Sequence, residues 1–551
     1  MKPTILLLAG LLAVTGLEAQ TRKDANGIND TTSDTYRKSD DTGNKYARPV
    51  PGSSRKGKNP VLFLVGNSTM RTGTKGNGSN GQWGWGAFAA QWFDSTRITV
   101  ENHALGGTSS RTFYNNLWPD VLKGVKKGDY VLIELGHNDN GPLDSFTARN
   151  SIHGIDPDTC VHVTLHDCRN PRDNGKEETV YSYGEYLRKF IRDVRAKKAH
   201  PIIASLTPRN SWDNDTTITR KLQTITLWSR QVAEEMQVPW VDLEGVSAAR
   251  LERFGHWKTD YMFYYVDKIH TSRFGAENNA YSAALAIKQC PDCGLKDYLV
   301  DLTPVTADVR RQPGKPVVWL CGDSTCKNND NDSTGMWGWG SQAYLYFDST
   351  KCTFANEAKA GRSCRTYLNE GRWDKVYNSL QPGDIVLLQF GHNDTGDIDT
   401  KKERADIATG LDSTHVYRMA SNGEYEAVYS FGWYLKKMIQ DAREKGAVPV
   451  LLSLTPRNEW PGGRIERRNS SYGRWYRQVV EATGVDFIDV HNITADALDA
   501  LGQEAAREYY NRDHTHTSLK GARLNAHSVY EGLRAIGYYD ILVPECDILA
   551  K

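Results

Sequence analysis

Two serines stand where a side chain can act as a nucleophile. Ser68 lies in the sequence GNST (66–69) and Ser324 lies in GDST (322–325), each directly after an apolar run and before a helical pattern. A serine in such a turn has an exposed hydroxyl and a free backbone N–H, which nucleophilic attack and oxyanion binding both require. Serine also caps many helices, so this motif alone does not decide the chemistry.

A carboxylate and an imidazole, three residues apart, recur further along the chain in DKIH (267–270) and DHTH (513–516). Histidine can take the serine proton near neutral pH, and an aspartate on its other ring nitrogen fixes the tautomer. The second motif can also be interpreted as a zinc site, because His514 completes a His-x-His pair. Lys268 stands at that position in the first motif, so the shared D-x-x-H spacing favours acid–base chemistry and no metal.

Two further residue types can bind a developing oxyanion. Asn138 and Asn393 lie in GHND sequences after apolar runs, and their side chains can donate an N–H. Gly107 and Gly361 lie in ALGGTSSR and AKAGRSCR, where the missing Cβ lets a backbone N–H approach a ligand closely. Taken separately, these glycines and asparagines are ordinary turn formers.

All of these motifs occur twice and in the same order, which indicates a tandem duplication of one domain. The separation falls from 256 residues between Ser68 and Ser324 to 246 between His270 and His516, so the length differences are small and belong in loops. The tetrapeptide WGWG also recurs, at 83–86 and 337–340, and we expect its tryptophans in the core rather than stacked on sugars.

Within each copy, short apolar runs such as VLFLV (61–65) and YVLIEL (130–135) alternate with amphipathic helical patterns. This alternation predicts an α/β fold with a parallel sheet covered on both faces, in which functional residues follow the carboxyl ends of the strands. The expected segments are a signal peptide at 1–19, a flexible polar arm at 20–58, a first domain at 59–292, a linker at 293–315 and a second domain at 316–551.

The composition fits this organisation. A chain of 551 residues is too long for one core, and 39% hydrophobic with 25% charged residues is typical of globular proteins. A formal net charge of +1 gives no reason to expect a nucleic-acid partner. The apolar start of the chain is too short for a membrane span and predicts a secreted or periplasmic protein.

In chain order, Ser, Gly, Asn and Asp-x-x-His resemble the SGNH (GDSL-type) hydrolase superfamily, and AGRS, FGHND and DHTHTS are most similar to its rhamnogalacturonan acetylesterase family. The resemblance covers residues 61–290 and 317–540. It implies two flavodoxin-like three-layer α/β/α domains that hydrolyse O-acetyl esters of pectin-type polysaccharide without a cofactor or metal. The implied roles are nucleophile for Ser68 and Ser324, oxyanion donor for Gly107, Asn138, Gly361 and Asn393, and acid–base partner for Asp267, His270, Asp513 and His516.

The first copy departs from the family pattern at two positions. Asn67 replaces the aspartate of GDS, and Thr108 stands where the second copy has Arg362. We expect Arg362 to bind substrate, together with Arg209 and Arg457 of the two TPRN sequences, whose alternative role is bonding loop carbonyls. The resemblance also implies a disulfide between Cys160 and Cys168; the other seven of the nine cysteines cannot be paired from the sequence.

These observations predict an exported esterase that acts on an acetylated polysaccharide or oligosaccharide, with one site in each domain. Three alternatives remain open within the same chemistry: acetyl-xylan, a methyl ester, or a lipid ester as the substrate. A fourth is that the first domain is a non-catalytic carbohydrate-binding copy. An apolar acyl pocket would favour a lipid, whereas a shallow cleft with arginines and aromatics would favour a sugar.

Overall fold

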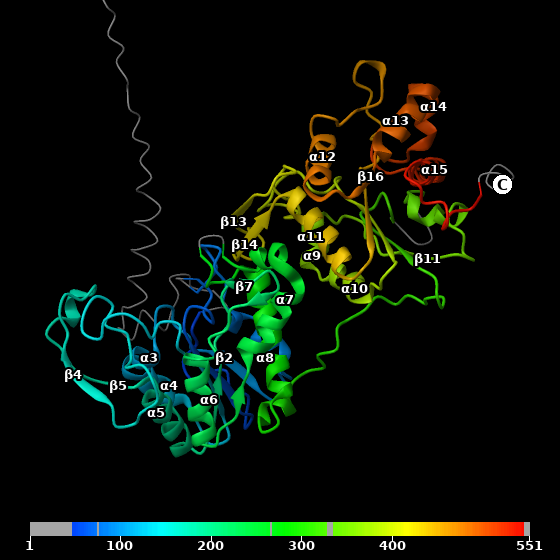
Figure 1. Ribbon diagram of the computed structural model, residues 1–551. Helices are drawn as coiled ribbons and strands as arrows, with labels where there is room; N and C mark the ends of the chain where they lie inside the picture. Colours follow the sequence, from blue (N-terminus) through cyan, green and yellow to red (C-terminus); the bar gives the residue numbers. More distant parts are fainter. Residues whose placement is uncertain (1–46, 74–75, 265–266, 328–333, 545–551) are drawn as a thin grey trace, which may run out of the picture. The chain divides into compact units, whose positions relative to one another are not determined.

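A computed structural model describes residues 47–73, 76–264, 267–327 and 334–544 (Figure 1). The chain divides into two compact units, residues 1–302 and 303–551, which are called domain 1 and domain 2 below. The expected signal peptide and most of the expected polar arm lie outside the described residues. No helix among those residues is long and apolar enough to cross a membrane.

Domain 1 is built on a parallel five-stranded sheet with the strand order β2-β1-β3-β6-β9. Strand β1 lies inside the sheet and is buried along its whole length. The sheet strands are β1 (Val61–Gly66), β2 (Thr99–Asn102), β3 (Tyr130–Glu134), β6 (His200–Ala204) and β9 (Trp240–Val241). The predicted parallel α/β fold is confirmed.

Helices cover both faces of this sheet, because successive side chains of β1 point to opposite sides. Phe63 packs in the cluster that holds Phe113 and Phe190, whereas Leu64 packs in the cluster that holds Ala283. The α-helices are α3 (Ser110–Asn116), α4 (Trp118–Gly124), α5 (Tyr183–Ala196), α6 (Ile225–Glu235), α7 (Leu243–Met262) and α8 (Arg273–Gln289). The short helices are η1 (Trp85–Ala87), η2 (Ala89–Trp92), η3 (Pro171–Asp173) and η4 (Gly294–Tyr298).

Domain 2 repeats this architecture with the strand order β11-β10-β12-β15-β16, again parallel. Its strands are β10 (Val317–Gly322), β11 (Thr353–Asn356), β12 (Ile385–Gln389), β15 (Val448–Leu452) and β16 (Asp486–Ile488). Its α-helices are α9 (Cys364–Asn369), α10 (Arg372–Ser379), α11 (Phe431–Glu444), α12 (Tyr472–Thr483), α13 (Val490–Leu501), α14 (Gln503–Ala506) and α15 (Leu519–Ala535). Its short helices are η5 (Trp339–Leu345), η6 (Pro461–Gly463) and η7 (Arg507–Tyr509).

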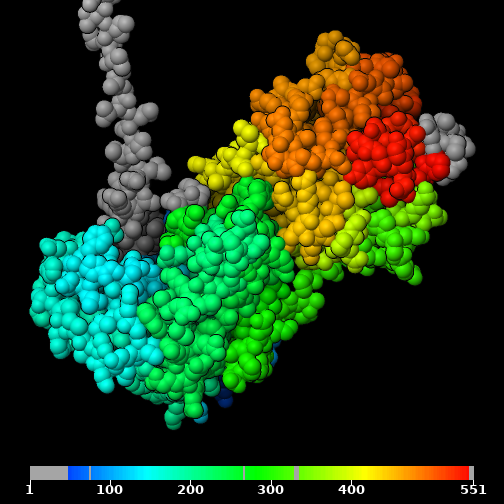
Figure 2. Space-filling view, in the orientation of Figure 1, coloured from blue at the N-terminus to red at the C-terminus, as the bar shows by residue number. Residues whose placement is uncertain are grey.

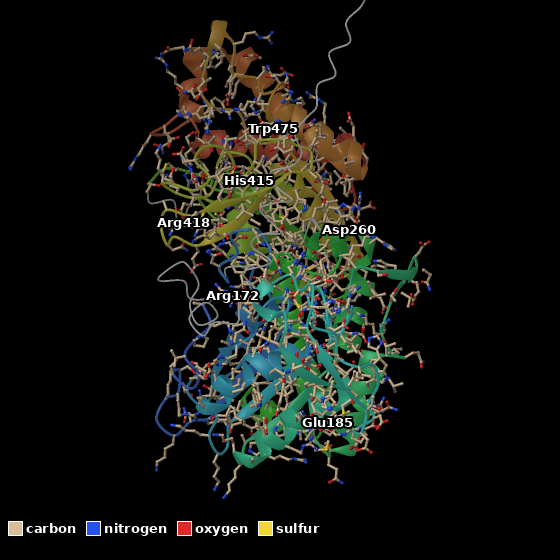
Figure 3. All side chains as sticks on the ribbon, turned by 90° about the vertical axis from the view of Figure 1, so that its left-hand side faces the viewer. Arg172, Glu185, Asp260, His415, Arg418 and Trp475 are labelled. Atoms are coloured by element: carbon tan, nitrogen blue, oxygen red, sulfur yellow. The ribbon has the colours of Figure 1, made fainter. Side chains whose placement is uncertain are left out.

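Each domain inserts an antiparallel hairpin after its GHND sequence. Domain 1 has β4 (Cys160–Thr164) and β5 (Glu177–Tyr181), drawn in cyan at its surface in Figures 1 and 2. Domain 2 has β13 (Thr414–Arg418) and β14 (Tyr425–Tyr429), and Figure 3 labels His415 and Arg418 on the first of these strands. Domain 1 also has a small ladder of β7 (Trp212–Asn214) and β8 (Thr217–Ile218).

The predicted disulfide is wrong in this structure, where Cys160 and Cys168 are both free. Cys160 opens β4 and faces Tyr181 across the hairpin, whereas Cys168 follows the far end of the strand and pairs with Phe146. A strand rises about 3.3 Å per residue, so the four steps to Thr164 already span about 13 Å. That length exceeds the Cα separation of about 4.4–6.8 Å that a disulfide bridges.

Two segments expected to be arm or linker pack against the domains instead. Both Nη atoms of Arg55 donate to the buried carboxylate of Asp129 at 2.6 Å. In the same way Arg311 pairs with buried Asp384 of domain 2. The division between the domains falls after residue 302, inside the expected linker 293–315. A buried carboxylate needs a paired cation, which explains why both polar segments are held in place.

Candidate active site

The two serines lie in tight turns at the carboxyl ends of β1 and β10. In domain 1 the side chain of Asn67 accepts a hydrogen bond from the backbone N–H of Thr69 at 3.1 Å. In domain 2 the carboxylate of Asp323 accepts the matching bond from Thr325 at 2.9 Å. Asparagine and aspartate side chains both form this turn, so Asn67 preserves the local geometry that carries Ser68.

In each domain a serine, a histidine and an aspartate form one hydrogen-bonded chain. Ser68 Oγ lies 2.7 Å from His270 Nε2, and His270 Nδ1 lies 2.7 Å from Asp267 Oδ2. In domain 2 the corresponding distances are 2.9 Å from Ser324 Oγ to His516 Nε2 and 2.7 Å from His516 Nδ1 to Asp513 Oδ2. The predicted residues are therefore brought together, and both ring nitrogens of each histidine are engaged.

The aspartates are held as carboxylates. Burial raises the pKa of Asp267, but the hydrogen bonds and charge of His270 outweigh it, so the net shift is downward. In Asp513 the same opposition leaves the pKa at about 2, with bonds from His516 and two backbone N–H groups outweighing burial. An ionised aspartate beside Nδ1 stabilises the imidazolium that forms when the serine loses its proton.

The WGWG segment holds the D-x-x-H loop against each sheet. Trp83 donates its backbone N–H to the carbonyl of Thr271 and accepts the hydroxyl of Thr271 at 2.7 Å. Thr517 bonds to the carbonyl of Trp337 in the same way, at 2.8 Å. Trp83, Trp85 and Trp339 are fully buried and Trp337 is half-buried, so these tryptophans are largely core residues, as the sequence predicts.

The glycine and asparagine of the predicted oxyanion hole lie side by side in both domains. Gly107 and Gly361 have φ of 78° and 79°, a left-handed conformation that favours glycine. Asn138 Nδ2 donates to the carbonyl of the residue after Gly107 at 2.9 Å, and Asn393 donates to the carbonyl after Gly361 at 3.1 Å. An amide nitrogen carries two hydrogens, so one remains to bind an oxyanion.

One arginine in each domain lies beside this glycine and was not predicted. Arg149 Nη1 donates to the carbonyl of Gly107 at 3.2 Å, and Arg404 Nη1 donates to that of Gly361 at 3.3 Å. Each follows its GHND asparagine by 11 residues, so comparison of the two copies could have found this pair. Burial lowers the pKa of both guanidiniums, and no acid among the described residues forms an ion pair with either.

The histidines of GHND are structural partners that lie below the catalytic groups. His137 Nε2 lies 3.2 Å from Thr207 Oγ1, and His392 Nε2 lies 3.3 Å from Thr455 Oγ1. Burial, and then neighbouring cations, lower the pKa of both histidines well below the usual value. They are therefore neutral near pH 7 and keep a fixed hydrogen-bonding pattern.

The predicted arginines have different surroundings. Arg362 is paired with Glu370, Nε to Oε2 at 3.0 Å, and therefore does not point a free charge at a ligand. Arg209 and Arg457 are half-buried, and their Nε atoms have no partner among the described residues. Both lie close to the GHND histidine of their own domain, whose pKa their charge lowers.

The two domains differ beneath the site. Asp139 accepts hydrogen bonds from the hydroxyls of Ser110 and Ser151. The second copy has Cys364 and Asp406 at these places, so buried Asp394 meets another carboxyl group. Burial raises the pKa of Asp394 to about 6 and that of Asp406 well above its usual value. Asp394 and Asp406 therefore share a proton between them, whereas in the first copy the hydroxyls of Ser110 and Ser151 supply the hydrogens that Asp139 accepts.

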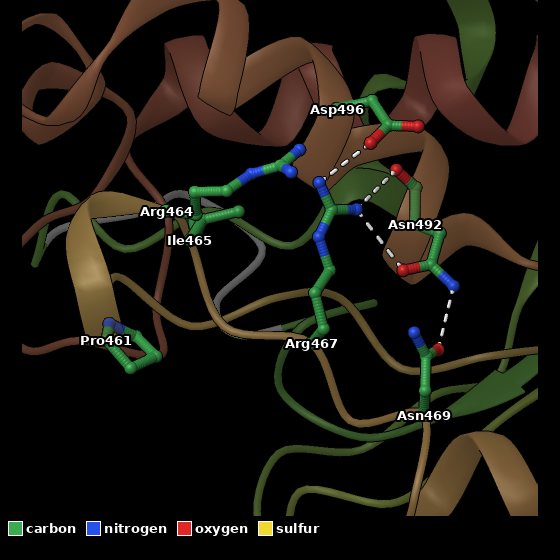
Figure 4. A pocket seen from close by; sticks show the side chains of 7 residues that line it. All are labelled: Pro461, Arg464, Ile465, Arg467, Asn469, Asn492 and Asp496. Atoms are coloured by element: carbon green, nitrogen blue, oxygen red, sulfur yellow. Dashed lines mark hydrogen bonds and ion pairs between the residues drawn. The ribbon is translucent and has the colours of Figure 1, made fainter.

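A separate surface hollow of about 500 Å³ lies in domain 2 (Figure 4). Arg467 at its centre is bonded to Asn492 and Asp496. None of its lining residues belongs to the serine, histidine, aspartate or oxyanion set. The lining residues are Pro461, Arg464, Ile465, Arg467, Asn469, Asn492 and Asp496.

A parallel α/β fold in which a serine at a strand end is hydrogen-bonded to a histidine, and that histidine to an aspartate, defines a serine hydrolase. The chain belongs to the GDSL-like lipase/acylhydrolase family, which matches residues 64–277 and 320–524, once in each domain. It is an esterase with two such domains in tandem. The predicted SGNH membership is confirmed.

Several proteins of known name resemble one part of the chain. It is 34% identical to a rhamnogalacturonan acetylesterase of Emericella nidulans over 209 residues, which are 38% of this chain and 81% of that protein. It is 30% identical to the rhamnogalacturonan acetylesterase RhgT of Bacillus subtilis over 240 residues, 40% of this chain and 92% of that one. The solved acetylxylan esterase Axe2 of Geobacillus stearothermophilus is 19% identical, covering 41% of this chain and 96% of its own, with a TM-score of 0.29.

Proposed function

We propose that the protein is an exported carbohydrate esterase that removes O-acetyl groups from a pectin-type, rhamnogalacturonan-like polysaccharide, with one active site in each domain. The observation that carries the proposal is the hydrogen-bonded chain from serine through histidine to aspartate, which occurs twice beside a glycine and an asparagine. The names of the similar proteins support the substrate class. The apolar start of the sequence at 1–19 supports export.

In the proposed mechanism, His270 or His516 takes the serine proton as Oγ bonds to the acetyl carbonyl carbon. The electron pair of the C=O bond moves to the carbonyl oxygen, and three N–H donors stabilise that oxyanion. These donors come from the serine backbone, the glycine backbone and the asparagine side chain. The intermediate collapses as the bond to the sugar oxygen breaks, and the histidine returns its proton to that oxygen.

The acetyl-serine is then hydrolysed by the same groups. Water loses a proton to the histidine and attacks the acetyl carbon, and the oxyanion forms again in the same place. Collapse breaks the bond to Oγ, which recovers the proton, and acetate leaves. The aspartate keeps its charge throughout, which agrees with the lowered pKa of Asp267 and Asp513.

A substrate panel tests the proposed specificity. Acetate release is measured from acetylated rhamnogalacturonan and acetyl-xylan, methanol release from methyl-esterified pectin, and acid release from a long-chain lipid ester. We expect the highest kcat/KM on acetylated rhamnogalacturonan. A higher value on acetyl-xylan, on the methyl ester or on the lipid ester would contradict the proposed substrate class but leave the serine chemistry intact.

A further inference from the structure

The segment after the TPRN sequence differs in charge between the domains, although one matching backbone hydrogen bond closes it in both. Thr219 donates its backbone N–H to the carbonyl of Ser211, and Glu466 donates to that of Glu459, both at 2.8 Å. Ser211 and Glu459 are therefore equivalent positions, as are Thr219 and Glu466. Domain 2 has two carboxylates where domain 1 has two hydroxyls.

In domain 2 these carboxylates face the cationic side of the site. Glu459 Oε1 lies 3.4 Å from Nδ1 of His514, inside the D-x-x-H motif, and 4.0 Å from Nη1 of Arg457. Glu466 Oε2 lies 2.9 Å from Nε of Arg468. The cations of this segment are thus neutralised by the chain itself, and half-exposed Glu459 places a negative charge at the rim.

In domain 1 the matching positions carry Arg209, Lys221 and Lys268, and none of the three forms an ion pair with any described residue. Asn210 donates its backbone N–H to the carbonyl of Lys268 at 2.8 Å, so the D-x-x-H loop and the TPRN segment are in contact. The charge of Arg209 acts on Lys221, and both cations act on His137, as does His270. Arg209 and Lys221 therefore lie on the same side of the site as the catalytic His270.

Three acids of the same region of domain 1 accept hydrogen bonds, and the charge of one of them, Glu244, also acts on Lys221. Asp260 accepts a hydrogen bond from Nδ2 of Asn210 at 2.7 Å. Buried Glu244 accepts hydrogen bonds from the hydroxyl of Thr226 and the backbone N–H of Lys221, and its pKa is raised by burial. Asp213 accepts a hydrogen bond from the hydroxyl of Thr219. An uncompensated cation that is partly buried gains most from an anion that the substrate brings.

Building on the proposed esterase function, we propose that the two domains divide the substrate by charge. Domain 1 hydrolyses acetyl esters on sugars that carry a carboxylate near the ester, that is, acetylated uronates, which Arg209, Lys221 and Lys268 attract. Domain 2 hydrolyses acetyl esters on uncharged sugars, because Glu459 and Glu466 neutralise the corresponding cations and leave a uronate no free partner among them.

The test uses full-length single-site proteins. Ser324→Ala leaves the site of domain 1, and Ser68→Ala leaves that of domain 2. Each is assayed by acetate release from an acetylated oligogalacturonide and from its carboxyl-reduced counterpart, in which an uncharged hydroxymethyl group replaces each carboxylate. The quantity of interest is the ratio of the two kcat/KM values, which cancels any general loss of folded protein. We expect this ratio to be about tenfold higher, or more, for domain 1.

Two matched exchanges test the residues. Ser211→Glu, made in the Ser324→Ala protein, is expected to lower the ratio of domain 1 about tenfold. Glu459→Ser, made in the Ser68→Ala protein, is expected to raise that of domain 2. Added salt should lower the ratio of unmodified domain 1 because it screens the attraction, and this measurement needs no exchange at the rim.

The outcomes separate the two proposals. If both single-site proteins release acetate with the same ratio, or if the exchanges and salt leave the ratios unchanged, the charge division is refuted and the esterase function stands. Acetylated rhamnogalacturonan is assayed beside the two oligosaccharides. If neither protein releases acetate from any of the three, the proposed function fails and the charge division fails with it.

Discussion

Glu134 gives domain 1 a pH-dependent stability at a position where domain 2 has an uncharged residue. It ends β3 beneath the serine turn and is fully buried. Its carboxylate accepts hydrogen bonds from Trp85 Nε1 at 3.0 Å and from the backbone N–H of Thr207 at 3.1 Å. Burial outweighs these bonds and raises the pKa of Glu134 from 4.5 to about 7. Domain 2 has Gln389 at this place, which accepts the same bond from Trp339.

The sign of the effect follows from the protons bound in each state. Between pH 4.5 and pH 7 folded Glu134 keeps its proton while the unfolded chain has lost it, so the free energy of unfolding falls as pH rises. A pKa shift costs about 1.4 kcal/mol per unit, so the rise to about 7 removes about 3 kcal/mol of stability by pH 8. Glu134→Gln abolishes this loss because glutamine does not titrate. Any cost of a weakened hydrogen bond to Thr207 is the same at every pH and does not change the slope.

The assay is the unfolding of the full-length protein, followed by calorimetry or denaturant from pH 4.5 to pH 8. We expect the free energy of unfolding of domain 1 in Glu134→Gln, minus that of the unmodified protein, to rise by about 3 kcal/mol across this range. Gln389→Glu is the matched control. It should make the free energy of unfolding of domain 2 fall with rising pH, as Glu134 does for domain 1. A difference that stays flat with pH would refute the reasoning.

Three further predictions concern the site. Asp406→Ser removes the carboxyl pair with Asp394, and burial raises the pKa of both acids. The free energy of unfolding of domain 2 in this variant, relative to the unmodified protein, should therefore rise from pH 5 to pH 8 in denaturant unfolding. Asn138→Ala and Asn393→Ala should each lower kcat of their own domain by about 10²–10³, measured in single-site proteins. The lost hydrogen bond to the backbone carbonyl should lower the free energy of unfolding by only about 1 kcal/mol. Asp513→Asn should lower kcat of domain 2 by about 10⁴ through the wrong tautomer of the histidine.

Each of these has an outcome that contradicts it. A gain from Asp406→Ser that is equal at pH 5 and pH 8 would mean that the pair does not titrate. An asparagine variant that raises KM and keeps kcat would assign that amide to substrate binding rather than to the oxyanion. Full activity in Asp513→Asn would exclude the proposed triad of domain 2.

The sheet and the serine, histidine and aspartate were predictable because local rules and the repeat act together. Short apolar runs such as VLFLV that alternate with helical patterns are typical of buried strands, and parallel strands bring their carboxyl ends to one edge. Comparison of the two copies then shows which motif residues are not shared. Lys268 stands where the second copy has His514, which argues against a zinc site at His514. Asn67 shows the limit of motif matching, because the turn needs a side-chain acceptor and not a charge.

The remaining features depend on contacts that no local pattern encodes. Arg362 was expected at the ligand but is paired with Glu370, eight residues further along the chain. The expected bridge between Cys160 and Cys168 is absent because a hairpin sets their spacing. Arg149 was missed because it reaches the site only through its hydrogen bond to the carbonyl of Gly107. That residue lies 42 positions earlier in the sequence, and the fold of the intervening loops brings the two together.

The proposed chemistry requires two independent nucleophilic serines in one chain, and counting the reactive serines tests this requirement most directly. A serine-directed fluorophosphonate bonds to an activated serine and adds a fixed mass, which intact-protein mass spectrometry detects. We expect two labels on the unmodified protein, one on Ser68→Ala, one on Ser324→Ala and none on the double variant. A single label on the unmodified protein, or a label that survives in the double variant, would contradict the account.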